Sequence, residues 1–147
     1  MFTFTTSIQY CIDILARELR KGKEIKGLGQ LKNRLFHCKT GGRPRAAIHV
    51  SPNIDAMVLI QYSDSDLVSV RICTPDLDFV AVCAYLPFDS PLSPPGPTFT
   101  RIVDFCKREG LPLLIGSDCN SHHTVWGSSN VNERGEDLIQ YLLTTDL

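Results

Sequence analysis

Residues 116–135 read GSDCNSHHTVWGSSNVNERG and follow the apolar run 111–115. A short apolar run that stops at a glycine is typical of a buried strand. Asp118 and Asn120 stand two positions apart, and on an extended backbone such side chains point the same way. A carboxylate can orient or deprotonate a water, and a carboxamide N–H can donate to a phosphate oxygen. Taken alone, Asp-x-Asn is more simply an Asx turn that ends a strand, and only the longer context favours phosphoryl chemistry.

The chain before this block predicts one helix and then a series of strands. Apolar residues at helical spacing from Ile8 to Leu19 predict an amphipathic helix over residues 7–20. Turn-forming residues separate the apolar runs that follow, and short connections suit antiparallel neighbours. The predicted strands are 46–50, 57–61, 67–73 and 78–85, with a short one near 35–38.

The regions beside the block complete the predicted fold. Five prolines between residues 87 and 97 exclude regular structure there. A helix is predicted over about 98–108, ended by Gly110, and a last helix over about 134–143. This order indicates a single α/β domain, residues 1–147, with a mixed and mostly antiparallel sheet. Because no later strand covers Leu138, Leu142 and Leu143, we expect a truncated domain whose exposed edge promotes self-association.

The composition suits a globular domain. The 147 residues are 43% hydrophobic and 21% charged. No apolar run approaches the ~20 residues of a membrane helix, and the first residues lack the marks of a signal peptide. The six cysteines show no C-x-x-C spacing, so we expect small buried hydrophobes rather than disulfides or zinc ligands. Together these features predict an intracellular protein, cytoplasmic or nuclear, that is neither secreted nor bound to a membrane.

Charge is unevenly divided along the chain, although the net charge is −1. Residues 1–50 carry ten Lys and Arg against three Asp and Glu, whereas residues 51–147 carry five against thirteen. A basic segment can attract phosphate backbones, and an acidic one can collect divalent cations. For any single charge, solvated surface is the simpler interpretation.

The block GSDCNSHHTVWGSSNVNERGEDL resembles the G-D-x-N-A-H-H-x-x-W-G-S…N-x-R-G-x-x-L block of endonuclease domains in non-LTR retrotransposons. Three upstream segments also resemble this family: KGLG at 26–29, as in jockey-like members, RPRAAI at 43–48, and VCAYLPFDS at 82–90. The resemblance covers residues 22–147, approximately. It implies the endonuclease/exonuclease/phosphatase superfamily, part of a deoxyribonuclease-I-like four-layered α/β sandwich, and Mg²⁺-dependent nicking of DNA.

The resemblance implies roles for three residues. Asp118 matches the aspartate that positions the nucleophilic water, and Asn120 matches the asparagine that supports the phosphate and that water. Tyr85 matches the tyrosine near the scissile phosphate. Tyr85 also ends a predicted strand beside the proline-rich loop, where its hydroxyl could reach a pocket rim. A packed ring with its hydroxyl in solvent is an equally good interpretation of this residue alone.

Other residues of the matching segments are candidates for contacts with the substrate. His122 and His123 could contact DNA, and we expect one to point outward and the other to pack. Arg45 is a candidate phosphate contact, with surface charge as the alternative. We expect Trp126 in the core rather than as a platform for base stacking, and Arg134 to pair with a carboxylate.

Three departures from the family pattern bear on activity. Ser121 replaces an alanine, which should leave the chemistry intact. The metal-binding Q-E-P motif is missing, because Glu18 lacks its flanking Gln and Pro and falls in the predicted helix, so the metal ligands stay unknown. The later S-D-H-type motif is not found. Residues that act as a unit lose activity out of proportion. We therefore predict little nuclease activity for this chain alone, and Mg²⁺-dependent plasmid nicking abolished by Asp118→Ala would contradict that.

Two alternatives to an endonuclease stay open. One is a non-catalytic remnant that binds nucleic acid weakly through its basic first third. The other is a phosphatase of the same superfamily, against which the H-H-x-x-W-G-S segment argues. Plasmid nicking separates the first from an enzyme, because salt-sensitive DNA binding without Mg²⁺ would favour binding alone.

Overall fold

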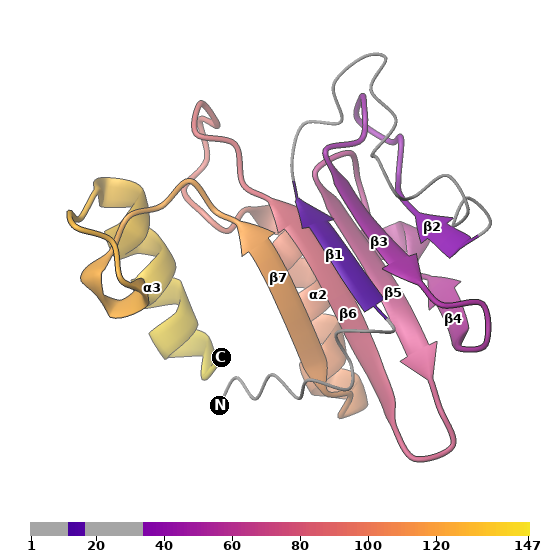
Figure 1. The fold of residues 1–147 in the computed structure, drawn as a ribbon. Coiled ribbons are helices and arrows are strands. Elements are labelled where there is room, and N and C mark those ends of the chain that lie inside the picture. The colour runs from indigo at the N-terminus through magenta and orange to yellow at the C-terminus, as the bar shows by residue number, and fades with distance from the viewer. Residues whose placement is uncertain (1–11, 17–33) are drawn as a thin grey trace.

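The computed structural model describes residues 12–16 and 34–147, which form two β-sheets packed face to face (Figure 1). The three-stranded sheet has the order β1 (Ile12–Ala16), β3 (Ala46–Val50), β2 (Leu35–Phe36), and its pairs are antiparallel. The four-stranded sheet has the order β4 (Asp55–Val58), β5 (Leu67–Cys73), β6 (Asp78–Tyr85), β7 (Leu113–Asp118). Only β6 and β7 run parallel. The predicted α/β sandwich with mixed, mostly antiparallel pairing is confirmed.

Three strands have the bounds that the sequence predicts, namely β3, β5 and β6. β4 lies two residues earlier than expected, and a 3-10 turn, η2 (Ile60–Tyr62), follows it. β7 begins and ends later than expected, so that Gly116 and Asp118 belong to the strand. Asp118 is therefore the last strand residue, held in the sheet, and not part of a loop.

The predicted helix over residues 7–20 is wrong for its described part. Residues 12–16 form β1, which pairs with β3 from Ile12 opposite Val50 to Ala16 opposite Ala46. Helical spacing is a weak signal over so few residues, and pairing along the edge of β3 overrides it. The β-branched side chains of Ile12 and Ile14 also favour a strand. The rest of the predicted helix lies outside the described residues.

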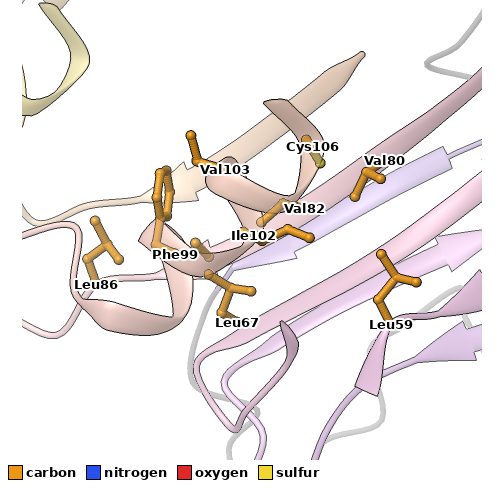
Figure 2. Packing of buried hydrophobic residues seen from close by; sticks show 10 residues of the cluster. Leu59, Leu67, Val80, Val82, Leu86, Phe99, Ile102, Val103 and Cys106 are labelled. Atoms are coloured by element: carbon orange, nitrogen blue, oxygen red, sulfur yellow. The ribbon is translucent and has the colours of Figure 1, made fainter. Parts of the chain in front are cut away.

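Two hydrophobic clusters hold the layers together. The first fills the space between the sheets and contains Phe79, Ala81 and Cys83 of β6. The second lies between β6 and helix α2 (Pro97–Glu109), as Figure 2 shows for Val80 and Val82. Because both faces of β6 are covered, its residues from 79 to 84 are all buried, as in the central strands of layered α/β proteins.

The two helices follow the sequence prediction closely. α2 ends at Gly110, whose φ of 65° is the left-handed cap that glycine favours. α3 (Glu133–Thr145) begins at the cap residue Asn132. The ring of Phe99 in α2 meets that of Tyr141 in α3 edge-on at 6.1 Å. α3 thus packs against the start of α2, beside the sheet (Figure 1).

β7 is an edge strand of the four-stranded sheet. Beside it lies an apolar cavity of about 720 Å³, lined from β7, α2 and α3 by residues that include Ile115, Val103 and Leu142. An apolar surface is thus present where the sequence predicts one, while self-association through it stays a prediction. Over the described residues, no helix has the length and apolar character needed to cross a membrane.

The described cysteines agree in part with the expectation of buried hydrophobes. Cys38, Cys83 and Cys106 are buried, whereas Cys73 and Cys119 are half-buried. Burial raises the pKa of the Cys106 thiol to about 11, which makes it a poor nucleophile at neutral pH.

Candidate active site

Tyr85 and Asp118 end two neighbouring parallel strands and pair in register. The backbone N–H of Leu86 donates to the carbonyl of Asp118 at 2.9 Å, which extends the pairing past both strand ends. Side chains alternate along a strand, and Cys83 and Leu114 of these strands pack between the sheets. Tyr85 and Asp118 therefore point toward the three-stranded sheet, just beyond the core. Their side chains are brought to the same edge, as the sequence predicts for a strand-end site.

Asn120 reaches this edge by a route that the sequence did not predict. Extended backbone from Asp118 to Asn120 was expected, but β7 ends at Asp118 and Asn120 has a φ of 46° in the left-handed region. Asparagine tolerates this conformation better than most residues. Its Nδ2 donates to the carbonyl of Leu86 at 3.1 Å. The carboxamide is thus fixed to the residue that follows Tyr85, and among the described residues its remaining N–H and its oxygen have no partner.

Asp118 and Asn120 are half-buried, so neither is sealed beneath packed side chains. In the described part of the chain, the Asp118 carboxylate accepts no hydrogen bond from another residue. A half-buried carboxylate that no protein donor satisfies is suited to bind a water, a cation or both. An oriented carboxylate beside an anchored carboxamide and a phenol is a set of groups that can bind a phosphoester and a water together.

Arg45 covers the ring of Tyr85. Its guanidinium carbon lies 4.8 Å from the ring centroid, and its Nε and Nη2 both donate to the carboxylate of Asp66 at 2.5 Å. Hydrogen bonding to Asp66 raises the pKa of the guanidinium further above its usual range. The sequence predicted Arg45 at the site but gave no signal for Asp66, because the two lie on different sheets.

The loop after Asn120 is held by hydrogen bonds to its own backbone. Ser121 is buried, and its hydroxyl donates to the Cys119 carbonyl at 3.0 Å. Replacing the usual alanine with serine therefore leaves no polar group unsatisfied. The indole N–H of Trp126 donates to the carbonyl of Ser121 at 3.0 Å. Trp126 remains 38% exposed, so it anchors the loop at the surface rather than filling the core as expected.

One histidine points outward and the other packs, as the sequence predicts. His122 is exposed, and its Nδ1 lies 2.9 Å from Oδ1 of Asn130. The side chain of His123 is only 15% exposed, and its ring lies 5.2 Å from that of Trp126. Its Nδ1 accepts from the backbone N–H of Val125 at 3.1 Å, and its Nε2 lies 4.0 Å from Glu136. His123 is therefore part of the loop's own packing.

Asn132 ties this loop to α3. Its Oδ1 accepts from the backbone N–H of Gly135 at 2.8 Å and from that of His122 at 2.9 Å. A Cβ added at Gly135 would overlap the carbonyl oxygen of His122, so only glycine permits this approach. Neither residue was singled out from the sequence as structural. The available signal was the spacing of a capping asparagine three positions before a glycine.

Several predicted residues lie away from this constellation or outside the structure. Glu18 and the segment 26–29 fall outside the described residues. Arg134 lines a second cavity of about 180 Å³ beside Tyr85, with its Nε buried and unsatisfied. The carboxylate partner expected for it is not found among residues 34–147. Within the described ranges, no group of three or more His, Cys, Asp or Glu is arranged to hold a metal ion.

The described fold is an α/β sandwich in which an acid, an amide and a phenol lie at or just after the carboxyl ends of two neighbouring strands. Residues 79–147 match the family model described as "Endonuclease-reverse transcriptase". Among solved structures, the chain is similar to the endonuclease domain of TRAS1, a telomere-specific non-LTR retrotransposon, with a TM-score of 0.65 and 26% identity. That alignment covers 76% of this chain and 52% of the TRAS1 chain, so this chain spans about half the length of that domain. Among curated proteins, none matches.

These comparisons confirm the resemblance that the sequence indicates. Residues 79–147 match the endonuclease-reverse transcriptase family, and the fold is similar to that of a non-LTR retrotransposon endonuclease domain.

Proposed function

We propose that this chain carries the water-positioning half of a DNA phosphodiesterase site. The observation that carries the proposal is the convergence of Asp118, Asn120 and Tyr85 on one sheet edge, with Asn120 anchored to Leu86. Asp118 orients or deprotonates the attacking water, and the free N–H of Asn120 donates to a phosphate oxygen. The Tyr85 hydroxyl lies near the scissile phosphate.

Mg²⁺ is the cofactor that the family implies, and the donors present fit it in part. The Asp118 carboxylate is half-buried, accepts no protein hydrogen bond within the described residues and is an oxygen ligand of the kind that Mg²⁺ prefers. Mg²⁺ needs only one or two protein carboxylates when waters and phosphates complete its shell. When bound, it would neutralise charge that builds on the phosphate.

The second carboxylate is not identified among the described residues, and Glu18, which the sequence analysis did not favour as a metal ligand, lies outside them.

DNA is the proposed substrate, through contacts made by the site loop. His122 is exposed, and because Asn130 engages its Nδ1, its Nε2 is the nitrogen left for a contact with DNA. His123 and Arg45 were also predicted from the sequence as DNA contacts, and both already have partners in the protein. This proposal differs from the prediction of little activity made from the sequence, and the following experiment decides between the two.

Single-turnover nicking of supercoiled plasmid with excess protein tests the proposal. We expect slow, Mg²⁺-dependent nicking that Asp118→Asn lowers by at least about 100-fold, because a positioned base contributes ~10²–10⁴-fold. Asp78→Asn is the matched control, since Asp78 begins β6 at the opposite end of the same sheet and should leave the rate within about two-fold.

Two results would overturn the proposal. One is DNA binding that weakens with salt and needs no Mg²⁺, without nicking at any protein concentration, which would identify a non-catalytic binding domain. The other is nicking that Asp118→Asn and Asp78→Asn reduce equally, which would place the chemistry elsewhere. Hydrolysis of a small phosphoester in preference to plasmid DNA would favour a phosphatase instead.

A further inference from the structure

We infer that Arg45 and Asp66 are positioning residues for Tyr85, and that Arg45 does not act by binding DNA phosphate. The inference rests on the proposed function for the role of Tyr85. Its structural basis is the contact of the Arg45 guanidinium with the Tyr85 ring at 4.8 Å and its two hydrogen bonds to Asp66.

The three residues come from three separate segments of the chain, which lie together at this end of the sandwich. Arg45 precedes β3 of the three-stranded sheet, Asp66 precedes β5 of the four-stranded sheet, and Tyr85 ends β6. Arg45 therefore reaches from one sheet across to the other, over the last ring of the central strand. The ion pair therefore links the two sheets at the end where Asp118 lies.

Backbone hydrogen bonds fix the frame on which this pair is built. The N–H of Arg45 donates to the carbonyl of Ser65 at 2.7 Å, and the N–H of Tyr85 donates to that of Asp66, also at 2.7 Å. The carboxylate of Asp64 accepts from the N–H groups of Asp66 and Leu67 at 2.8 and 2.9 Å. The turn that presents Asp66 is thus rigid before any ligand binds.

Two of the three guanidinium nitrogens of Arg45 are already engaged in this arrangement. A bidentate carboxylate satisfies Nε and Nη2 and compensates the charge, so a DNA phosphate would have to compete with Asp66 for these two nitrogens. The guanidinium carbon also lies over the Tyr85 ring, where cation–π attraction favours it. The pair therefore restricts the tilt of the Tyr85 ring, and with it the place that the hydroxyl reaches. Small displacements of a catalytic group can cost ~100-fold in rate.

Four variants test the inference, because the same sheet offers a matched pair. Arg45→Met and Asp66→Asn are compared with Arg71→Met and Asp78→Asn, which remove an Arg–Asp pair at the other end of the sheet. We expect Arg45→Met and Asp66→Asn to lower kcat for nicking about 10-fold with KM within about two-fold, and the control variants to change neither.

DNA binding as a function of salt separates positioning from phosphate contact. A lost phosphate contact lowers the slope of log K against log salt by about one. We expect Arg45→Met to leave this slope unchanged. Asp66→Asn frees the guanidinium, so a phosphate-binding role predicts tighter binding and unchanged kcat, whereas positioning predicts a lower kcat. A changed slope in Arg45→Met, or full activity in Asp66→Asn, overturns the inference.

The Nε–H resonance of Arg45 in ¹H–¹⁵N NMR gives a readout that needs no catalysis. Stacked on the ring, this proton should show a ring-current shift that Tyr85→Leu and Asp66→Asn abolish and Asp78→Asn preserves. If the wild-type chain fails to nick DNA, the proposed function fails. This resonance still shows whether Asp66 holds the Arg45 guanidinium over the Tyr85 ring. A shift that persists in Asp66→Asn would show that the ion pair does not hold the guanidinium on the ring, which overturns the inference.

Discussion

The two ends of the four-stranded sheet carry the same kind of ion pair in different surroundings. At the hairpin end, Arg71 of β5 donates through two nitrogens to Asp78 of β6, and at the site end Arg45 does so to Asp66. The exposed fractions are similar, 37% and 42% against 31% and 27%. Only the site-end pair has an aromatic ring beneath it, that of Tyr85. Exposure and geometry therefore do not distinguish the two pairs, and the neighbouring ring does.

Neither pair is expected to hold the fold together. Partly exposed pairs contribute ~0–1 kcal/mol, whereas each fully buried aliphatic side chain contributes ~1.5–3 kcal/mol. The buried residues of β5 and β6 between the two ends supply that stabilisation. Substitutions at either end of the sheet therefore leave the same core intact. Their effects on nicking can be compared directly.

Apart from Asp118, the residue at the site end with the largest expected effect on nicking is Asn120. Asn120→Gly keeps the left-handed backbone but removes the carboxamide, so we expect nicking to fall ~10²–10³-fold, as when one donor to a developing anion is lost. Asn120→Ala should lower nicking to the same extent and also destabilise the fold by ~1 kcal/mol relative to the glycine variant, because alanine is strained at a φ of 46°.

Plasmid nicking and urea unfolding of both variants make this measurement. A glycine variant that nicks at the wild-type rate would show that the carboxamide only shapes the turn. In that case only Asp118 and Tyr85, of the three candidate residues, would keep a proposed role in nicking.

Substitutions of two glycines extend the comparison of the two ends to the free energy of unfolding. Gly135→Ala places a Cβ against the His122 carbonyl at the site end, so we expect a loss of ~2–4 kcal/mol, within the range for overpacking and backbone strain. Gly110→Ala lies before β7 at the opposite end, where an added Cβ meets no atom within 4 Å and only the φ of 65° opposes it. We expect ~1 kcal/mol there. Equal losses in urea unfolding would contradict the close approach of the loop to α3.

The central strands could be predicted from the sequence because local signals suffice for them. Turn-forming residues bound β3, β5 and β6, and their apolar runs have the length of strands, so their limits were correct. β1 could not be predicted this way, because five residues fit both a helical and a strand pattern. Its pairing partner, β3, lies some thirty residues later in the chain.

The residues of the candidate site stay a prediction from the sequence, and their geometry could not be predicted from it. Asp118, Asn120 and Tyr85 followed from a motif, while the left-handed turn at Asn120 and its bond to Leu86 depend on a strand 34 positions away. The Asp66 partner of Arg45 is 21 positions away on the other sheet. Such contacts depend on how the sheets stack, and no periodicity in a single sequence reports that. Arg45 was accordingly predicted as a phosphate contact, and the dependence of DNA binding on salt decides between that role and the positioning role inferred above.

The smallest expected effect concerns pH and the hairpin end. Hydrogen bonds from Arg71 lower the pKa of the Asp78 carboxyl from its usual 3.8. A lowered carboxyl pKa adds stability above the unfolded-state value, and that stability is lost as the pH falls through the folded-state value. Asp78→Asn should therefore lower the urea midpoint slightly at pH 6, and the difference from wild type should shrink as the pH falls from about 4 toward 2, with nicking unchanged. Because Asp78 is well exposed, solvent screening keeps the effect small. If the difference in urea midpoint is the same at pH 2 and pH 6, packing accounts for it and the charge on Asp78 does not. The hairpin-end pair would then no longer serve as an electrostatic match for Arg45 and Asp66.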